Sequence, residues 1–288
     1  MSQVLDSTLS SAEQKQVADR HAAVFVRLSK LAPFHPTALK LMNISVESAS
    51  AMKDFETAFK SDPSLTADLL LVANSAEFGI RSRIETIRHA ITFLGLERIR
   101  SLGCTIAFSF YVRNLPRSTY MRSAWSHSIA TAVIAELIGD LLGASEMYTA
   151  GLVHDLGRMA LFLSAGEEYA VKLSEEFDTL AQANELEEKY FGMDHCEAGA
   201  LVSKEWLFPD SLRTFMARHH DCNGAQPNKQ LSIVQLACKM ADAAGFPEVA
   251  RRDVGDELEL PERLRGRPEL AIDRLKDLIN KQIASMGG

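Results

Sequence analysis

The chain has 288 residues, of which 47% are hydrophobic and 24% charged, a composition typical of globular rather than disordered proteins. This length suffices for one large domain or two small ones with a sizeable core. A net charge of -7 excludes the global basic field that attracts nucleic acid or an anionic membrane. We therefore expect no direct nucleic-acid binding and no membrane association.

The predicted elements are helical along the whole chain. Hydrophobic residues recur at helical spacing, and strand-like alternation is hard to find, so the fold class is predicted to be all-α. In chain order, helices are expected over residues 10–30, 37–44, 50–60, 65–75, 84–94, 96–112, 119–142, 145–156, 158–163, 166–176, 179–191, 194–205, 210–219, 230–244 and 269–285.

Turn and cap residues separate these helices. Asp62 or Ser61 is expected to cap the helix that Pro63 begins. Asn74 and Ser75, where that helix ends, are interpreted as a capping and packing device rather than as a site. The segment 114–116 is the first plausible internal boundary, because Pro116 interrupts helical spacing there.

The N-terminal segment, the apolar runs and the cysteines indicate the cellular compartment of the protein. The N-terminal residues lack the basic and apolar segments of a secretory signal, and no run of about 18 apolar residues predicts a membrane helix. The scattered cysteines favour reduced thiols in a cytoplasmic protein over a disulfide framework or a zinc ribbon. These four residues are Cys104, Cys196, Cys222 and Cys238.

The pair His154-Asp155 follows an apolar helical segment and is the most informative chemical feature. Burying such a pair is costly without partners. Gly157 is interpreted as the residue that ends this helix, so the pair would lie at the negative end of the helix dipole, which favours a cation. The bland alternative is a core histidine that is hydrogen-bonded to a carboxylate.

Further histidines and a carboxylate lie on separate predicted helices. Imidazole nitrogen and carboxylate oxygen are the ligand mix of divalent or iron sites. The predicted metal centre would hold one or two ions of Fe, Mn, Ni, Co or Zn, and Asp155 would bridge a pair. The alternative is a relic site whose histidines and carboxylates satisfy one another. The predicted ligands are His127, His154, Asp155, His195, His219, His220 and Asp242.

The order of these residues resembles the HD phosphohydrolase superfamily, whose signature is His, His-Asp and Asp. The extra histidines resemble its two-metal branch, the HD-GYP cyclic-di-GMP phosphodiesterases. Two departures stand out: no Gly-Tyr-Pro motif follows His219-His220, and Arg158 replaces the lysine usual after the His-Asp-x-Gly run. The missing motif argues against cyclic-di-GMP as a substrate.

A closer resemblance is to the HDOD family of bacterial signalling proteins, over about residues 28 to 245. It is carried by segments in the family's order, at 61–66, 71–79, 84–95, 151–157 and 206–209. The resemblance implies an HD-like helical bundle behind an N-terminal helical lobe. The implied divisions are an N-terminal helix (1–30), the lobe (31–115), the HD-like subdomain (116–245) and a C-terminal extension with a helix (246–288).

Two functions are therefore expected. The favoured one is a signal-transduction output or regulatory module with a metal-binding HD site, which would bind a signalling protein or a small nucleotide ligand. The alternative is a metal-dependent phosphohydrolase or phosphodiesterase acting on a nucleotide or cyclic nucleotide. In the alternative, Asp155 would support a bridging water, and Arg158 would steady a phosphate oxygen.

Overall fold

The computed structural model describes residues 11–75, 83–113, 119–166, 169, 171, 180–221, 228–248, 258 and 260–285. Every regular element within these ranges is a helix, so the all-α prediction is confirmed. The predicted boundary at 114–116 and the family-like residues 76–79 lie outside the described ranges. Among the helices described, none has the length and apolar character needed to cross a membrane.

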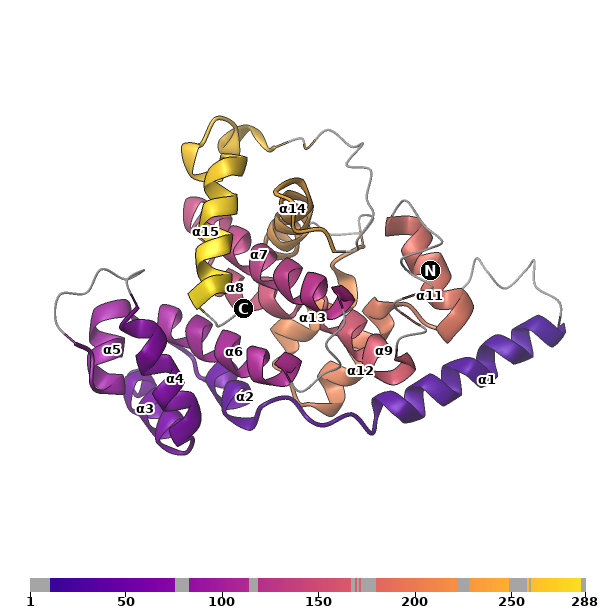
Figure 1. Ribbon diagram of the computed structural model, residues 1–288, viewed down its shortest axis with the longest axis horizontal. Helices are drawn as coiled ribbons and strands as arrows, with labels where there is room; N and C mark the ends of the chain where they lie inside the picture. The colour runs from indigo at the N-terminus through magenta and orange to yellow at the C-terminus, as the bar shows by residue number, and fades with distance from the viewer. Residues whose placement is uncertain are drawn as a thin grey trace.

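The first part of the chain forms a lobe around α6. Its helices are α2 (Pro36–Asn43), α3 (Ala51–Lys60), α4 (Pro63–Ala73), α5 (Ile87–Leu94) and α6 (Leu96–Arg113), and α1 (Ser11–Leu28) precedes the lobe. Helices α2, α4 and α5 pack on α6, with α3 between them (Figure 1). As predicted, Asp62 caps α4 by accepting a hydrogen bond from the Leu65 amide at 3.0 Å.

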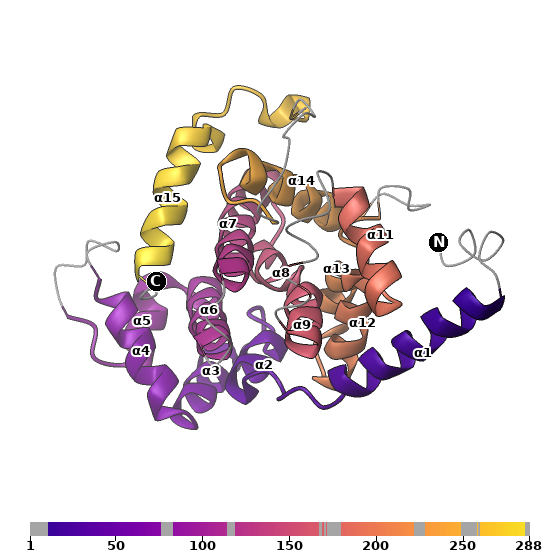
Figure 2. The same ribbon diagram turned by 45° about the vertical axis from the view of Figure 1, so that its right-hand side comes forward.

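The second part is a bundle in which α7 runs through the centre. Its helices are α7 (Thr119–Leu142), α8 (Met147–Val153), α9 (Leu156–Ala165), α11 (Leu180–Phe191), α12 (His195–Glu205), α13 (Asp210–Arg218) and α14 (Lys229–Ala243). Helices α8 and α14 pack on α7, while α12 packs between α9 and α13 (Figure 2).

Two helices distant in sequence close the bundle. Helix α1 lies along α9, α11 and α12, so the N-terminal helix packs on the second part of the chain (Figure 2). The C-terminal α15 (Ile272–Ser285) follows the short turns η3 (Glu262–Leu264) and η4 (Pro268–Leu270) and packs on α7. Leu275 and Ile279 of α15 are fully buried there, as its amphipathic pattern predicts.

The region around His154-Asp155 corrects the sequence interpretation. One helix was expected over 145–156, but α8 ends at Val153 and α9 begins at Leu156, so the pair forms the corner between two helices. Gly157 is therefore not a helix terminator but the second residue of α9. Its lack of a side chain serves packing, because a Cβ there would lie 2.0 Å from the carbonyl oxygen of His195.

Candidate metal centre

Two glycines allow the site-bearing helices to approach one another. A Cβ at Gly151 would lie 2.8 Å from the Cα of Ala132, so α8 can press against α7 only without a side chain at this position. Gly157 does the same for α9 against α12. The corner residues His154 and Asp155 are thereby placed between α7 on one side and α12 on the other.

The first group of possible ligands consists of His127, His154 and Cys238. One donor atom from each lies within 4.8 Å of the others, and the rings of the two histidines are 5.3 Å apart between centroids. His127 on α7 directs Nδ1 to the carbonyl oxygen of Phe246 at 2.9 Å. Its Nε2 lies 3.5 Å from Cys238 Sγ of α14. A carbonyl partner at Nδ1 leaves the Nε2 lone pair directed at this group.

His154 completes this group in the same tautomer. Its Nδ1 lies 2.7 Å from the carbonyl oxygen of Gly151, so it donates there and leaves a lone pair on Nε2. That Nε2 is buried and has no hydrogen-bond partner. Burial, with the neighbouring His127, lowers the pKa of His154 to about 3, so the ring is neutral at physiological pH. A buried neutral lone pair without a donor is the expected state of a metal ligand.

Asp242 lies behind His127 rather than beside the lone pairs. Its Oδ1 accepts a hydrogen bond from the Glu248 amide at 3.0 Å and lies 3.6 Å from His127 Nδ1. It thereby orients the histidine and holds the chain that leaves α14. A carboxylate in contact with the outer nitrogen of a histidine is a common support of metal sites.

The second group of possible ligands consists of His195, His219, His220 and Glu248, again with donor atoms within 4.8 Å of one another. His195 begins α12, whose N-terminus is capped by Asp194, and His219 and His220 directly follow α13. His195 Nε2 lies 3.2 Å from His219 Nε2. His220 Nε2 lies 3.5 Å from a carboxylate oxygen of Glu248.

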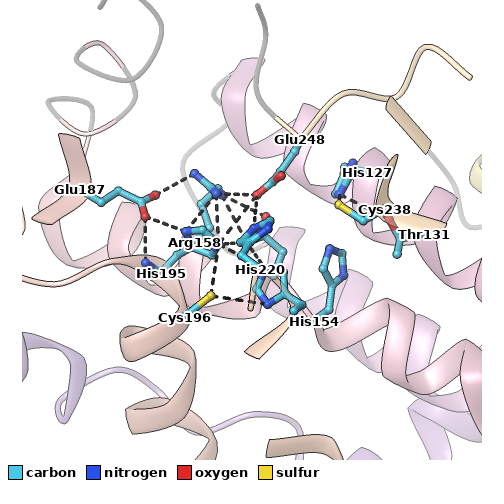
Figure 3. A network of polar contacts seen from close by, with 12 residues as sticks. His127, Thr131, His154, Arg158, Glu187, His195, Cys196, His220, Cys238 and Glu248 are labelled. Carbon is cyan, nitrogen blue, oxygen red and sulfur yellow. Dashed lines mark hydrogen bonds and ion pairs between the residues drawn. The ribbon is translucent and has the colours of Figure 1, made fainter. Parts of the chain in front are cut away.

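The guanidinium of Arg158 lies between Glu187 and Glu248 and beside His195 (Figure 3). Its Nη2 lies 2.5 Å from Glu248 Oε1 and 3.0 Å from His195 Nδ1. Its Nη1 donates to Glu187 at 2.7 Å, and its Nε donates to Asp155 at 3.2 Å. The side chain is fully buried, so three carboxylates surround one cation away from water.

Glu187 of α11 fixes the orientation of His195. It accepts hydrogen bonds from the His195 amide at 2.8 Å, from His195 Nδ1 at 2.6 Å and from the Tyr169 hydroxyl at 2.5 Å. Burial would raise the pKa of Glu187, but the Arg158 guanidinium and His195 together outweigh it, and the pKa falls to about 2. Burial and Arg158 would lower the pKa of His195, yet Glu187 and Cys196 together hold it well above its ordinary value.

Asp155 directly follows His154 of the first group, and its carboxylate faces the second group. Its Oδ1 is 3.7 Å from His195 Nε2 and 4.0 Å from His219 Nε2. Burial raises the pKa of Asp155 to about 7, against the opposing effect of Arg158. The seven predicted ligands thus gather in one buried region but do not form one shell: two join the first group, three the second, and two carboxylates lie outside both.

Three members of this region escaped the sequence analysis: Cys238, Glu187 and Glu248. Only Cys238 carried a usable signal, because it precedes Asp242 by one helical turn and therefore shares its face of α14. Glu187 lies within the charged run 185–189, which reads as a solvated helix face. Glu248 lies in the charged stretch after α14, where no periodicity applies.

The two groups differ in their fitness for a metal ion. The first offers two imidazole lone pairs and a thiol, a donor set that suits zinc or another borderline-soft ion. In the second, the donor atoms of Glu248 and His195 already contact the guanidinium of Arg158. The residues of the first group fit a metal, and those of the second group, with Arg158 in place, do not.

Comparison with known proteins decides the family. The sequence profile of the HDOD domain matches residues 31–222 of this chain. The chain belongs to the HDOD family. The matched residues include α2 to α9 and α11 to α13, and so contain both the N-terminal lobe and most of the site.

Relatives of this HDOD protein share its fold over nearly its full length. An HDOD domain protein with unknown function from Geobacter sulfurreducens is 25% identical, with a TM-score of 0.67 over 93% of this chain and 95% of that one. A Shewanella amazonensis protein named "Putative phosphohydrolase" is 20% identical, with a TM-score of 0.61 over 92% and 96%. A Marinobacter aquaeolei protein named "Putative signal transduction protein" is 18% identical, with a TM-score of 0.72 over 99% and 68%.

The HDOD protein is also similar to part of a longer curated protein. An uncharacterized protein of Treponema pallidum is 24% identical over 214 residues, which is 72% of this chain. The match covers 41% of that relative's length.

Proposed function

We propose that this HDOD protein is a regulatory module of bacterial signal transduction whose HD-like half holds one metal ion. His127 and His154 would bind the ion through Nε2, and Cys238 would bind it through its sulfur. The observation that carries this proposal is the buried His154 Nε2, which has no hydrogen-bond partner and lies with two other donor atoms in a group within 4.8 Å. Bound there, the ion would cross-link α7, the α8–α9 corner and α14.

Burial favours a regulatory role over turnover. His127, His154 and Asp155 are each 0% exposed, and Cys238 is 5% exposed. A phosphoester must bring its phosphorus within bonding distance of an attacking water. The burial of these residues opposes the approach of a substrate through the described part of the chain. An ion that joins three helices can instead stabilise one arrangement of the bundle, to which a signalling protein or a small nucleotide ligand would bind.

Elemental analysis of the purified protein tests the metal. We expect about one equivalent of a single transition metal, with zinc favoured by the thiol. The variants His154→Ala and Cys238→Ser should lose it. Cys104→Ser is the matched control, because Cys104 is also a buried thiol but lies on α6 outside the donor groups. Less than about a tenth of an equivalent, even after reconstitution, would contradict a metal role.

The alternative is a metal-dependent phosphohydrolase, and the Shewanella protein of similar fold is named "Putative phosphohydrolase". Asp155 would be its most important residue, because it follows His154 in the chain and its carboxylate lies near His195 and His219. The test is turnover of a generic phosphodiester by the metal-loaded protein. Turnover that Asp155→Ala abolishes would replace the regulatory proposal, whereas metal retention without turnover supports it.

A further inference from the structure

The guanidinium of Arg158 lies against two side chains that could otherwise bind a metal ion. The guanidinium contacts two members of the second group, with Nη2 at 2.5 Å from Glu248 Oε1 and at 3.0 and 3.2 Å from the two ring nitrogens of His195. Metal ions bind oxygen and nitrogen at about 2.0–2.2 Å. An ion held by these atoms would therefore overlap the guanidinium or lie directly against its positive charge.

The hydrogen bonds of His195 also oppose metal binding. Its Nδ1 contacts Glu187 at 2.6 Å, and its Nε2 contacts His219 Nε2 at 3.2 Å. His219 Nδ1 lies 3.1 Å from the carbonyl oxygen of Phe215 and donates to it, so His219 Nε2 is an acceptor. Both nitrogens of His195 therefore act as donors, and neither presents a lone pair to an ion.

The surrounding charges explain why a cation is present at all. Asp155, Glu187 and Glu248 contribute three carboxylates that are 0–1% exposed. Buried carboxylates require a compensating charge, because desolvation is costly. The Arg158 guanidinium supplies that charge and contacts all three. A metal ion would otherwise supply it for Asp155 and Glu248.

We propose that the guanidinium of Arg158 stands in for a second metal ion, so that the protein binds at most one ion in this region. A second site for a divalent cation, formed by Asp155, Glu248 and the buried His220 Nε2, which has no hydrogen-bond partner, would open only when the guanidinium is removed. The ligand class is a divalent ion that accepts nitrogen and oxygen donors, such as Mn²⁺. The proposed function is thereby limited to one bound ion in this region. The residues that support this limit belong to the second donor group, whereas the proposed function rests on the first.

The experiment compares ion stoichiometry between the unmodified protein and Arg158→Met, which removes the charge and keeps a side chain of similar reach. Both are dialysed to equilibrium against Mn²⁺, and bound manganese is measured. We expect Arg158→Met to bind one equivalent more than the unmodified protein. The double variant Arg158→Met/Glu248→Gln should lose that equivalent. Arg158→Lys keeps the positive charge and should gain none.

Thermal unfolding provides a readout if Arg158→Met is unstable. At an Mn²⁺ concentration about 100 times Kd, its melting temperature should rise by about 5 °C, and that of Arg158→Lys should not. An unmodified protein that binds two ions, or an Arg158→Met variant that gains neither manganese nor stability, would overturn the proposal. A gain in Arg158→Met alongside no metal in the unmodified protein would support it while refuting the first-group ion.

Discussion

The carbonyl oxygen of His195 lies 2.0 Å from the point at which a Cβ at Gly157 would be placed. This contact locks α9 against α12 through backbone atoms, which cannot move aside as a side chain can. Gly157→Ala should therefore lower the free energy of unfolding by about 3 kcal/mol, the upper part of the range for an overpacked core. Urea unfolding of the variant measures the loss.

Gly103 of α6 provides a matched comparison. A Cβ there would lie 2.7 Å from the Cδ1 atom of Leu41, the far end of a flexible side chain. Gly103→Ala should cost less than half as much as Gly157→Ala, because Leu41 can change rotamer. Equal losses in the two variants would mean that the α9–α12 contact is not the constraint described here.

Asn74 joins the end of α4 to the segment before α5. Its side-chain amide donates to the carbonyl oxygens of Leu70 and Ile84 at 2.7 and 2.8 Å and accepts from the Ile84 amide at 2.8 Å. The sequence interpretation of Asn74 as a structural residue is therefore confirmed. Asn74→Ala should cost about 1–2 kcal/mol of unfolding free energy, since the residue is exposed and water replaces part of the lost bonding.

Asn43 is the control for this prediction. It is exposed as well, and its side chain makes the corresponding bond to Leu39 at 2.7 Å without the bridge to a second segment. Asn43→Ala should change the unfolding free energy by no more than about 0.5 kcal/mol. A loss for Asn43→Ala as large as for Asn74→Ala would show that the bridge to Ile84 contributes nothing.

The helices could be predicted because their cause is local. The helix expected over 119–142 is observed as Thr119–Leu142, since its apolar residues recur at helical spacing over many turns. The break at His154-Asp155 could not be predicted in the same way. The glycines beside it serve contacts with α7 and α12, and those partners are far away in the sequence.

In the candidate site, too, residues with a local signal could be predicted, and residues defined by long-range contacts could not. His127 could be recognised because a histidine within an apolar stripe needs a partner. The centrality of Arg158 could not be recognised, because its partners Glu187 and Glu248 lie 29 and 90 residues away. A charged residue in sequence carries no sign of whether it faces water or a buried counter-ion, and only the packing of α9 and α11 decides between them.

Cys104 should be inert to thiol reagents in the folded protein. Burial raises its pKa to about 12, with Arg100 only partly opposing the rise, so thiolate is scarce at pH 8. Labelling with iodoacetamide followed by peptide mass mapping should leave Cys104 unmodified in buffer and modify it fully in urea. Rapid labelling of Cys104 under native conditions would contradict the packing of α6.

Glu187 should make stability depend on pH in a defined direction. Its folded-state pKa of about 2 lies below the ordinary value of 4.5, because Arg158 and His195 outweigh the effect of burial. A depressed carboxyl pKa stabilises the fold above the unfolded-state pKa, and this contribution is lost as pH falls toward the folded-state pKa. Glu187→Gln removes it, so the variant should be less stable at pH 7 by about 3 kcal/mol.

The decisive measurement is the difference in unfolding free energy between the unmodified protein and Glu187→Gln as a function of pH. It should be constant from pH 7 to about 5 and should shrink below about 4.5, because protonated glutamate resembles glutamine. Glu185→Gln, on the same helix but exposed, should differ little from the unmodified protein at every pH. A difference that stays constant down to the acid limit of the folded state would mean that Glu187 is not the charged partner of Arg158.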